Sequence, residues 1–216
     1  MRSGRLAAAV ALILALGCAA CDSSGGAADG GWTPLEVPSG LQPASAVASD
    51  APDRVEKSLL TTLPGLTRVP LDPEYGDDVA SPVCGNKQGA QAFSSESGMR
   101  REWRGTNTKV HQFAGAFGAV TAAQAVDQVA GKLGCGSYPA PDRDGGEYTG
   151  VHQVTVPSAR LAFCETVPAK NAFCTALLAR DDILVRIQVA AVDEAAATKE
   201  LGDVAPRAAE SLAKAW

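Results

Sequence analysis

Hydrophobic and polar residues alternate most regularly in the stretch Phe173–Val192, which we interpret as two strands that meet at Asp181-Asp182. After this turn, β-branched residues occupy every second position: Ile183, Val185, Ile187 and Val189. This is the period-two pattern of a half-buried strand. A turn centred on the aspartates sets three residues of each strand opposite one another: Cys174, Ala176 and Leu178 opposite Val189, Ile187 and Val185. We expect these six side chains to share the core side of a β-hairpin.

Two earlier stretches have the three-to-four-residue spacing of amphipathic helices. In Ala51–Leu63, apolar residues recur at every fourth position until Pro-Gly follows. In Thr121–Leu133, Thr121 and Gln124 have the spacing of a capping box, in which each side chain bonds the backbone of the other. We expect a helix at each stretch.

The C-terminus is also predicted to be helical, with Asp193 as its N-cap and an apolar stripe after it. Gly202-Asp203 ahead of Pro206 predicts a break, because proline inside a helix removes a backbone hydrogen bond.

Four further segments are expected to form strands: Gln91–Arg104, Lys109–Phe117, Tyr148–Val156 and Arg160–Val167. Strands that follow one another through short turns favour antiparallel pairing, and the helices flank them in the sequence. The predicted fold class is therefore α+β, with an antiparallel β-sheet covered by helices on one face.

The N-terminus has the layout of a secretory leader. Arg2 and Arg5 precede Leu6–Leu16, an apolar run of eleven residues that is too short to span a bilayer permanently. The segment that follows the leader is rich in Gly, Ser and Pro and lacks an apolar period. We therefore divide the chain into a lipoprotein signal peptide (1–20), a flexible tether (21–48) and a folded domain (49–216).

A cysteine shortly after the apolar run resembles the lipobox of bacterial lipoproteins, in which the cysteine thiol receives a diacylglycerol. Cys18 and Cys21 are the two candidates. Cys18 is favoured, because the lipobox disfavours a cysteine three residues upstream of the modified one. Each buried CH₂ of an acyl chain such as palmitate contributes about 0.8 kcal/mol to membrane binding. We expect the protein to be anchored by lipid at the extracytoplasmic face of the cell membrane.

The remaining four cysteines predict two disulfides, because an even number in an exported domain is typical of paired cysteines. Their number alone allows three connectivities. Cys164 and Cys174 lie symmetrically about Ala169, so a hairpin centred there sets them opposite each other on the core face. Cys84 with Cys135 then follows by elimination. No CxxC or His-x-His spacing occurs among these cysteines, so zinc is not expected.

The charge of the chain argues against nucleic acid as a partner. The net charge is −5 at pH 7, and it becomes −7 once a leader with two arginines is removed. An acidic protein is a poor general partner for nucleic acid or for anionic lipid surfaces. Aromatic residues make up only 5% of the chain, which argues against extensive stacking on sugars or bases.

The segment MRREWRG is a candidate ligand site. As a strand, it places Arg100 and Arg104 on one face with Glu102 between them, and Trp103 adjoins Arg104. Arginines beside an aromatic ring suit a small anion or a carboxylate. The alternative, which we favour, is a solvated strand face with Trp103 in the core.

Other candidate chemistry is sparse. Asp142, Asp144 and Glu147 offer oxygen ligands for calcium, but their loop is too short for the twelve-residue calcium motif. His111 and His152 each lie in a predicted strand, where histidine is more often a surface or hydrogen-bonded core residue than a base. No GxSxG, HExxH or P-loop motif occurs. We expect no catalytic residue, metal or cofactor.

Several features follow one another in a familiar order: SLLTTLPGLTRVPLDP, a later Cys84, an F-x-G-x-F strand, an Ala-rich helix before Cys135, and FCTALLARDDILVRIQV before a final helix. This order, over about residues 50–215, resembles the sensor-domain lipoproteins of actinobacteria, which are related to the PknH-like extracellular sensor domain of receptor kinases. The resemblance implies an extracytoplasmic binding or sensing domain with two disulfides and no known catalysis.

These observations predict a lipid-anchored, non-enzymatic binding or sensing domain whose partner is a small ligand or an envelope protein. The alternative is a cell-envelope hydrolase of unrecognised type. Turnover of generic ester, amide or phosphoester substrates would distinguish the two.

Overall fold

The computed structural model describes residues 48–70, 80–85, 97–118, 120–139, 146–168 and 171–216. The predicted leader and residues 21–47 of the tether lie outside these ranges. The elements are α1 (Ala51–Ser58), β1 (Thr67–Val69), η1 (Val83–Gly85), β2 (Ser97–Arg104), β3 (Thr108–Ala116), α2 (Ala122–Ala130), η3 (Leu133–Cys135), β4 (Ser137–Pro139), β5 (Glu147–Gln153), β6 (Leu161–Thr166), β7 (Ala172–Arg180), β8 (Ile183–Ala191) and α3 (Glu194–Ala213).

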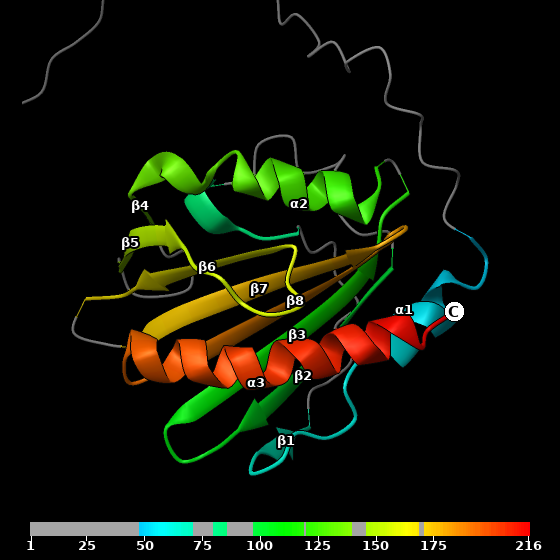
Figure 1. Cartoon of the computed structure of the whole chain (residues 1–216), viewed down its shortest axis with the longest axis horizontal. Helices are drawn as coiled ribbons and strands as arrows, with labels where there is room; N and C mark the ends of the chain where they lie inside the picture. The colour runs from blue at the N-terminus through cyan, green and yellow to red at the C-terminus, as the bar shows by residue number, and fades with distance from the viewer. Residues whose placement is uncertain (1–47, 71–79, 86–96, 119, 140–145, 169–170) are drawn as a thin grey trace, which may run out of the picture. The chain divides into compact units, whose positions relative to one another are not determined.

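The strands of the described residues form one antiparallel sheet in the order β1-β2-β3-β8-β7-β6-β5-β4 (Figure 1). The β7–β8 hairpin lies near its centre, and its predicted register is confirmed residue by residue: Cys174↔Val189, Ala176↔Ile187 and Leu178↔Val185. All six of these side chains are buried in the same core cluster. The hydrophobic alternation therefore identified the correct face, as a period of two requires.

The two faces of the sheet pack against different helices (Figure 1). The α3 face, which carries Cys174, Ala176 and Leu178, packs against α1 and α3. The α2 face carries Phe173, Thr175 and Leu177, and its apolar part packs against α2. The predicted α+β class and antiparallel sheet are confirmed, and the structure adds a helix on the second face. Central strands that are buried on both faces contain near-continuous apolar runs, as in Leu161–Cys164 and Phe173–Leu178.

The first helix is shorter than predicted. It ends at Ser58, whose hydroxyl donates to the Val55 carbonyl at 2.7 Å. Beyond it, the backbone bonds side chains of the sheet: Gln112 Oε1 accepts from the Leu60 amide at 2.9 Å, and Arg101 donates to the Leu60 carbonyl at 2.7 Å. These tertiary partners replace the helical hydrogen bonds that the apolar spacing predicted up to Leu63.

The other helices begin as predicted, but the predicted break in the last one is wrong. Thr121 and Gln124 form the capping box of α2, and the Asp193 carboxylate accepts from the Ala196 amide at the start of α3. α3 then runs unbroken through Pro206. Proline normally crowds the carbonyl of the residue four positions earlier, which here is Gly202, a residue without a side chain. Packing of the apolar stripe against the sheet maintains the helix.

Both predicted disulfides are present. Cys164–Cys174 joins directly paired residues of β6 and β7 with Cα atoms 4.1 Å apart. Cys84–Cys135 joins η1 to η3 across 51 residues, with Cα atoms 5.7 Å apart. The second crosslink closes the longer loop, so it removes more conformational entropy from the unfolded chain.

Candidate functional site

The residues predicted for an anion site do not line a common surface. Trp103 is fully buried in the core on the α3 face, which agrees with the alternative that we favoured from the sequence. Arg100 and Arg104 lie one residue out of phase with Trp103 along β2, so they belong to the α2 face. The Trp103 ring therefore has no exposed surface on which a ligand can stack, and ligand binding by Arg100 and Arg104 stays a prediction.

Glu102 is the centre of a cluster of charged groups on the α2 face. Its carboxylate is almost fully buried and accepts a hydrogen bond from Arg104 Nε at 2.6 Å. Lys109 Nζ lies 3.3 Å from the same carboxylate, and His111 Nδ1 lies 3.5 Å from it. Burial alone would raise the pKa of Glu102, but the hydrogen bond from Arg104 and the proximity of Lys109 outweigh burial, and the pKa is lowered. The negative charge of Glu102 is therefore balanced by positively charged side chains of the same domain.

His111 is uncharged at neutral pH. Burial and the nearby positive charge of Lys109 lower its pKa to about 4, although Glu102 acts in the opposite direction. A neutral imidazole carries no charge, so His111 contacts Glu102 without forming an ion pair with it.

A row of polar side chains crosses the α2 face from this cluster toward β7. Neighbouring strands pair these residues directly, as Glu102↔His111, His111↔Gln188 and Gln188↔Thr175. We call Glu102, His111, Gln188 and Thr175, together with the adjacent Glu165, the polar row. On one side of it lies the apolar cluster under α2, and on the other side lies a small cluster formed by Val167, Phe173 and Ala190.

Glu165 is the second buried carboxylate of the polar row. It lies on β6, where Glu165 pairs with Phe173 and Phe163 pairs with Thr175, so Glu165 and Thr175 are diagonal neighbours on one face. Glu165 is 2% exposed and accepts a hydrogen bond from the Tyr138 hydroxyl at 2.6 Å. Burial raises the pKa of Glu165 to about 7, against the lowering effect of that hydrogen bond. Burial and the Glu165 charge also raise the pKa of Tyr138.

Three aromatic rings lie around this end of the row. Tyr138 of β4 stacks on Tyr148 of β5 with ring centroids 5.0 Å apart. Tyr148 in turn meets Phe173 edge-on at 5.6 Å. Phe173 is the direct strand partner of Glu165. The carboxyl group of Glu165 thus lies beside aromatic side chains.

Thr175 adds an unpaired polar atom to the same region. Its side chain is 1% exposed, and Oγ1 has no hydrogen-bond partner among the described residues. Burial of a hydroxyl without a partner costs about 1–3 kcal/mol in proteins. Thr175 and Glu165 were missed from the sequence, although each interrupts an apolar run, FCTALL and LAFCET. A polar residue within a doubly buried strand is the signal that would have identified them.

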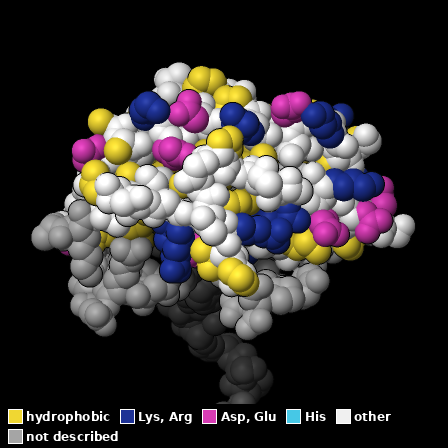
Figure 2. Space-filling model, turned by 90° about the horizontal axis from the view of Figure 1, so that it is seen from below, with side chains coloured by type: hydrophobic (Ala, Val, Ile, Leu, Met, Phe, Trp, Pro, Cys, Tyr) yellow, Lys and Arg dark blue, Asp and Glu magenta, His cyan; other side chains and the backbone are white. Residues whose placement is uncertain are grey.

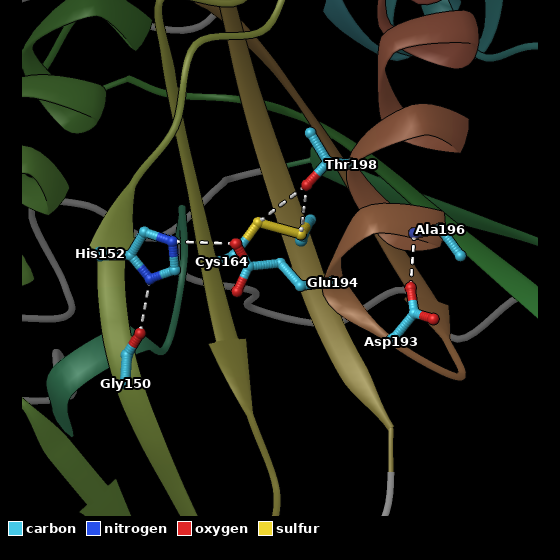
Figure 3. Close-up of a disulfide and its surroundings, with 8 residues drawn as sticks. Gly150, His152, Cys164, Asp193, Glu194, Ala196 and Thr198 are labelled. Atoms are coloured by element: carbon cyan, nitrogen blue, oxygen red, sulfur yellow. Dashed lines mark hydrogen bonds and ion pairs between the residues drawn. A yellow bond between two sulfur atoms is a disulfide. The ribbon is translucent and has the colours of Figure 1, made fainter.

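A separate group of contacts joins the Cys164–Cys174 disulfide to α3 (Figure 3). Thr198 Oγ1 lies 3.6 Å from Cys164 Sγ and 3.4 Å from Cys174 Sγ. Nearby, His152 Nδ1 lies 2.7 Å from the Gly150 carbonyl oxygen, and Nε2 lies 3.1 Å from Glu194 Oε1. Two acceptors around one imidazole favour its doubly protonated form, so the pKa of His152 is raised.

The remaining candidate chemistry is limited in the described part of the chain. Asp142 and Asp144 lie outside it, whereas Glu147 accepts a hydrogen bond from Ser137 Oγ at 2.6 Å. Cys18 and Cys21 also lie outside it. No group of three or more metal-ligating side chains occurs within the described ranges. Lys and Arg are interspersed with Asp and Glu on the face shown in Figure 2.

Among the residues that the structure describes, no helix is both long and apolar enough to cross a membrane. Over the described ranges, the domain consists of a two-faced antiparallel sheet, three α-helices and two disulfides.

This fold is similar to that of solved proteins. The extracellular domain of PknH from Mycobacterium tuberculosis superimposes with a TM-score of 0.56 at 14% sequence identity, over 81% of this chain and 100% of that domain. An uncharacterized protein from Mycobacterium smegmatis, the Rv0999 ortholog, has a TM-score of 0.39 at 12% identity, over 74% of this chain and 98% of that protein. No protein-family model and no curated protein matches the chain. The resemblance predicted from the order of sequence features is confirmed at the level of the fold.

Proposed function

We propose that the chain is a lipid-anchored, extracytoplasmic domain that binds a small ligand without catalysis. The observation that carries the proposal is the Glu165 end of the polar row. There a buried carboxyl group and a buried hydroxyl group share one face of the sheet, and Thr175 Oγ1 has no partner among the described residues. Buried polar groups are normally hydrogen-bonded, so the unpartnered hydroxyl of Thr175 supports a bound molecule at this place.

Three observations support the location and the sensing role. The leader, with Cys18 and Cys21 after it, matches the layout of a lipoprotein precursor. Two disulfides are typical of a domain that folds in an oxidising compartment. The fold is shared with an extracellular domain of another protein. A domain of this kind transmits a signal through a partner envelope protein or through the ligand that it holds.

Native mass spectrometry of the full chain extracted from membranes tests the binding function. We expect the wild-type protein to retain a small molecule, and the Thr175→Val variant, which removes only the hydroxyl, to retain less of it. Equal retention by both proteins, or no retained molecule after incubation with envelope extract, would contradict the proposal. Turnover of generic ester, amide or phosphoester substrates would contradict its non-enzymatic part.

Intact mass measurement tests the anchor. The membrane-extracted protein is expected to lack the leader and to carry a diacylglycerol on one cysteine. Cys18→Ser should abolish that modification, whereas Cys21→Ser should preserve it. Recovery from the membrane of an unmodified chain that still begins with Met1 would show that the lipid anchor is wrong.

A further inference from the structure

The two disulfides differ in their access to solvent. Cys164 and Cys174 are both fully buried, and Thr198 Oγ1 of α3 lies within 3.6 Å of each of their sulfur atoms. In the other disulfide, Cys135 is exposed and Cys84 is partly buried. A thiolate must reach one of the sulfur atoms to open a disulfide, so exposure determines which of the two reacts while the domain stays folded.

The backbone on both sides of Cys135 carries no side chains. Cys135 is the last residue of η3, and it lies between Gly134 and Gly136. Apart from the adjacent residues, no atom of the described chain lies within 4 Å of the position that a Cβ would take on either glycine. Within the described part of the chain, the flanks of Cys135 are therefore open to the approach of a second molecule.

Cys84 has an unfavourable backbone conformation. Its φ of 55° and ψ of 34° lie in the left-handed helical region. A residue with a Cβ is disfavoured there, because the Cβ comes too close to the following carbonyl oxygen. The disulfide ties Cys84 to η3 in this conformation, so opening the disulfide allows the backbone of η1 to relax.

The Cys84–Cys135 disulfide joins η1 to η3, two segments that are 51 residues apart. Next to it, Val83 of η1 and Leu133 of η3 are buried in the apolar cluster under α2. This packing and the buried disulfide do not depend on the redox state of Cys84. Reduction of Cys84–Cys135 should therefore loosen η1 locally and leave the sheet folded.

We propose that Cys84–Cys135 is a site of thiol–disulfide exchange with the dithiol of a two-cysteine oxidoreductase. A thiolate of that dithiol attacks Cys135 Sγ, and the electron pair of the S–S bond leaves on Cys84 Sγ, which takes up a proton. The second thiol of the partner then attacks the partner's own sulfur in the mixed disulfide and releases Cys135, which is protonated in turn. Two electrons and two protons pass to this chain, and the partner is left as a disulfide. The proposal is independent of the ligand proposed above and adds redox control of η1.

Differential alkylation tests the proposal on the full lipid-anchored chain in a non-ionic detergent, without denaturant. The protein is treated with about 0.1–10 mM dithiothreitol or with reduced thioredoxin, and new thiols are trapped with iodoacetamide. The remaining cysteines are labelled with isotopically heavy iodoacetamide after unfolding and complete reduction, so that peptide mass spectrometry reports each disulfide separately. Both reductants should open Cys84–Cys135 at least about tenfold faster than Cys164–Cys174, at a rate proportional to the reductant concentration, as direct attack on the folded protein requires.

A matched variant and hydrogen–deuterium exchange complete the test. The double variant Cys84→Ser/Cys135→Ser retains only the buried disulfide and should show no new thiol at Cys164 or Cys174. In the wild-type protein, native reduction should speed exchange in peptides that cover residues 80–85 at least about fivefold and leave β7 and β8 unchanged.

Three results would each overturn the proposal: equal rates for the two disulfides, a rate of Cys84–Cys135 reduction that does not depend on reductant concentration, or failure of thioredoxin to reduce it. Unchanged exchange in residues 80–85 after reduction would overturn the redox control of η1. If the double variant does not fold, the alkylation rates of the wild-type protein still decide between these outcomes.

Discussion

The two ends of the polar row show two ways of burying a glutamate. Glu102 is 4% exposed and Glu165 is 2% exposed, so desolvation opposes ionisation of both. At the β2–β3 end, Arg104 and Lys109 surround the carboxylate and its pKa is lowered. At the β6 end, burial outweighs the hydrogen bond from the neutral Tyr138 hydroxyl, and the pKa rises to about 7. The difference shows that burial does not by itself decide the charge of a carboxylate, because the groups that contact the carboxylate also shift its pKa.

The two glutamates therefore affect stability with opposite dependence on pH. Glu102 has a lowered pKa in the folded state, so its contribution is present above the unfolded pKa and is lost as the pH falls through the folded pKa. Glu165 has a folded pKa above its unfolded value. Its protonated form is favoured by folding, so its contribution is present below the unfolded value of about 4.5 and is lost as the pH rises through about 7.

The largest expected effect comes from Glu165→Gln. A pKa that rises from 4.5 to about 7 corresponds to roughly 3 kcal/mol, so the variant should be more stable than wild type by up to about that amount at pH 8. The difference should shrink toward zero near pH 4.5. Urea unfolding of both proteins between pH 4.5 and pH 8 measures it. A difference that does not change with pH would show that Glu165 does not titrate in this range.

The next effect has the opposite sign. Glu102→Gln should lower the free energy of unfolding at pH 7 by about 1–2 kcal/mol, because hydrogen bonds to charged groups contribute more than neutral ones and the partners are partly exposed. The loss should diminish as the pH falls through the folded pKa of Glu102. The same series of urea unfolding measurements determines this loss. If Glu102→Gln were more stable than wild type at pH 8, the two glutamates would not differ in the sign of their effect.

Removal of the Tyr138 hydroxyl tests how much its hydrogen bond stabilises the ionised form of Glu165. Tyr138→Phe should raise the pKa of Glu165 further and cost about 1 kcal/mol of stability at pH 8, since the carboxylate loses its hydrogen bond. The pKa is measured by ¹³C NMR of the Glu165 carboxyl group. The change in stability should be smaller in a Glu165→Gln background. An equal loss in both backgrounds would indicate that the hydroxyl acts through another contact.

The smallest expected effect concerns His152, which also contributes to the pH dependence of stability. His152 has a raised pKa because it bonds Gly150 and Glu194, so its stabilising effect is present below about pH 6.5 and is lost as the pH rises through its folded value. His152 and Glu194 are both well exposed, so His152→Gln should change stability at pH 5.5 by at most about 0.5 kcal/mol. Comparison of pH profiles with and without His152 shows how much of the decline toward pH 8 belongs to Glu165. A larger change would assign the decline to His152.

The sequence predicted those features that depend on local pattern. The β7–β8 register, the capping box of α2 and the pairing of Cys164 with Cys174 all follow from spacings within one hairpin or one helix turn. The predicted break in α3 was wrong because the effect of Pro206 depends on packing against the sheet, which no local pattern contains.

The candidate site was not predicted because its partners come from distant segments. Glu165 bonds Tyr138, 27 residues away, and Gln188 joins His111 and Thr175 only through pairing of three strands. The signal that was available locally, a polar residue inside an apolar strand, indicates burial but names no partner. The Arg100–Trp103–Arg104 segment shows the converse, because its residues are adjacent in sequence and lie on opposite faces of the sheet.

The strand order also sets the sequence of events by which the chain acquires its structure. β2–β3 is one local hairpin and β4 to β8 is a run of neighbours, yet β3 pairs with β8 along its whole length, from Thr108↔Ala191 to Ala116↔Ile183. A chain that is synthesised from its N-terminus exposes the edge of β3 until its last strand, β8, is available. An open strand edge can pair with other chains, and pairing between distant segments forms slowly. Glu102 and Glu165 thus belong to segments that pair separately, and they come to lie on one face of the sheet only when β8 pairs with β3.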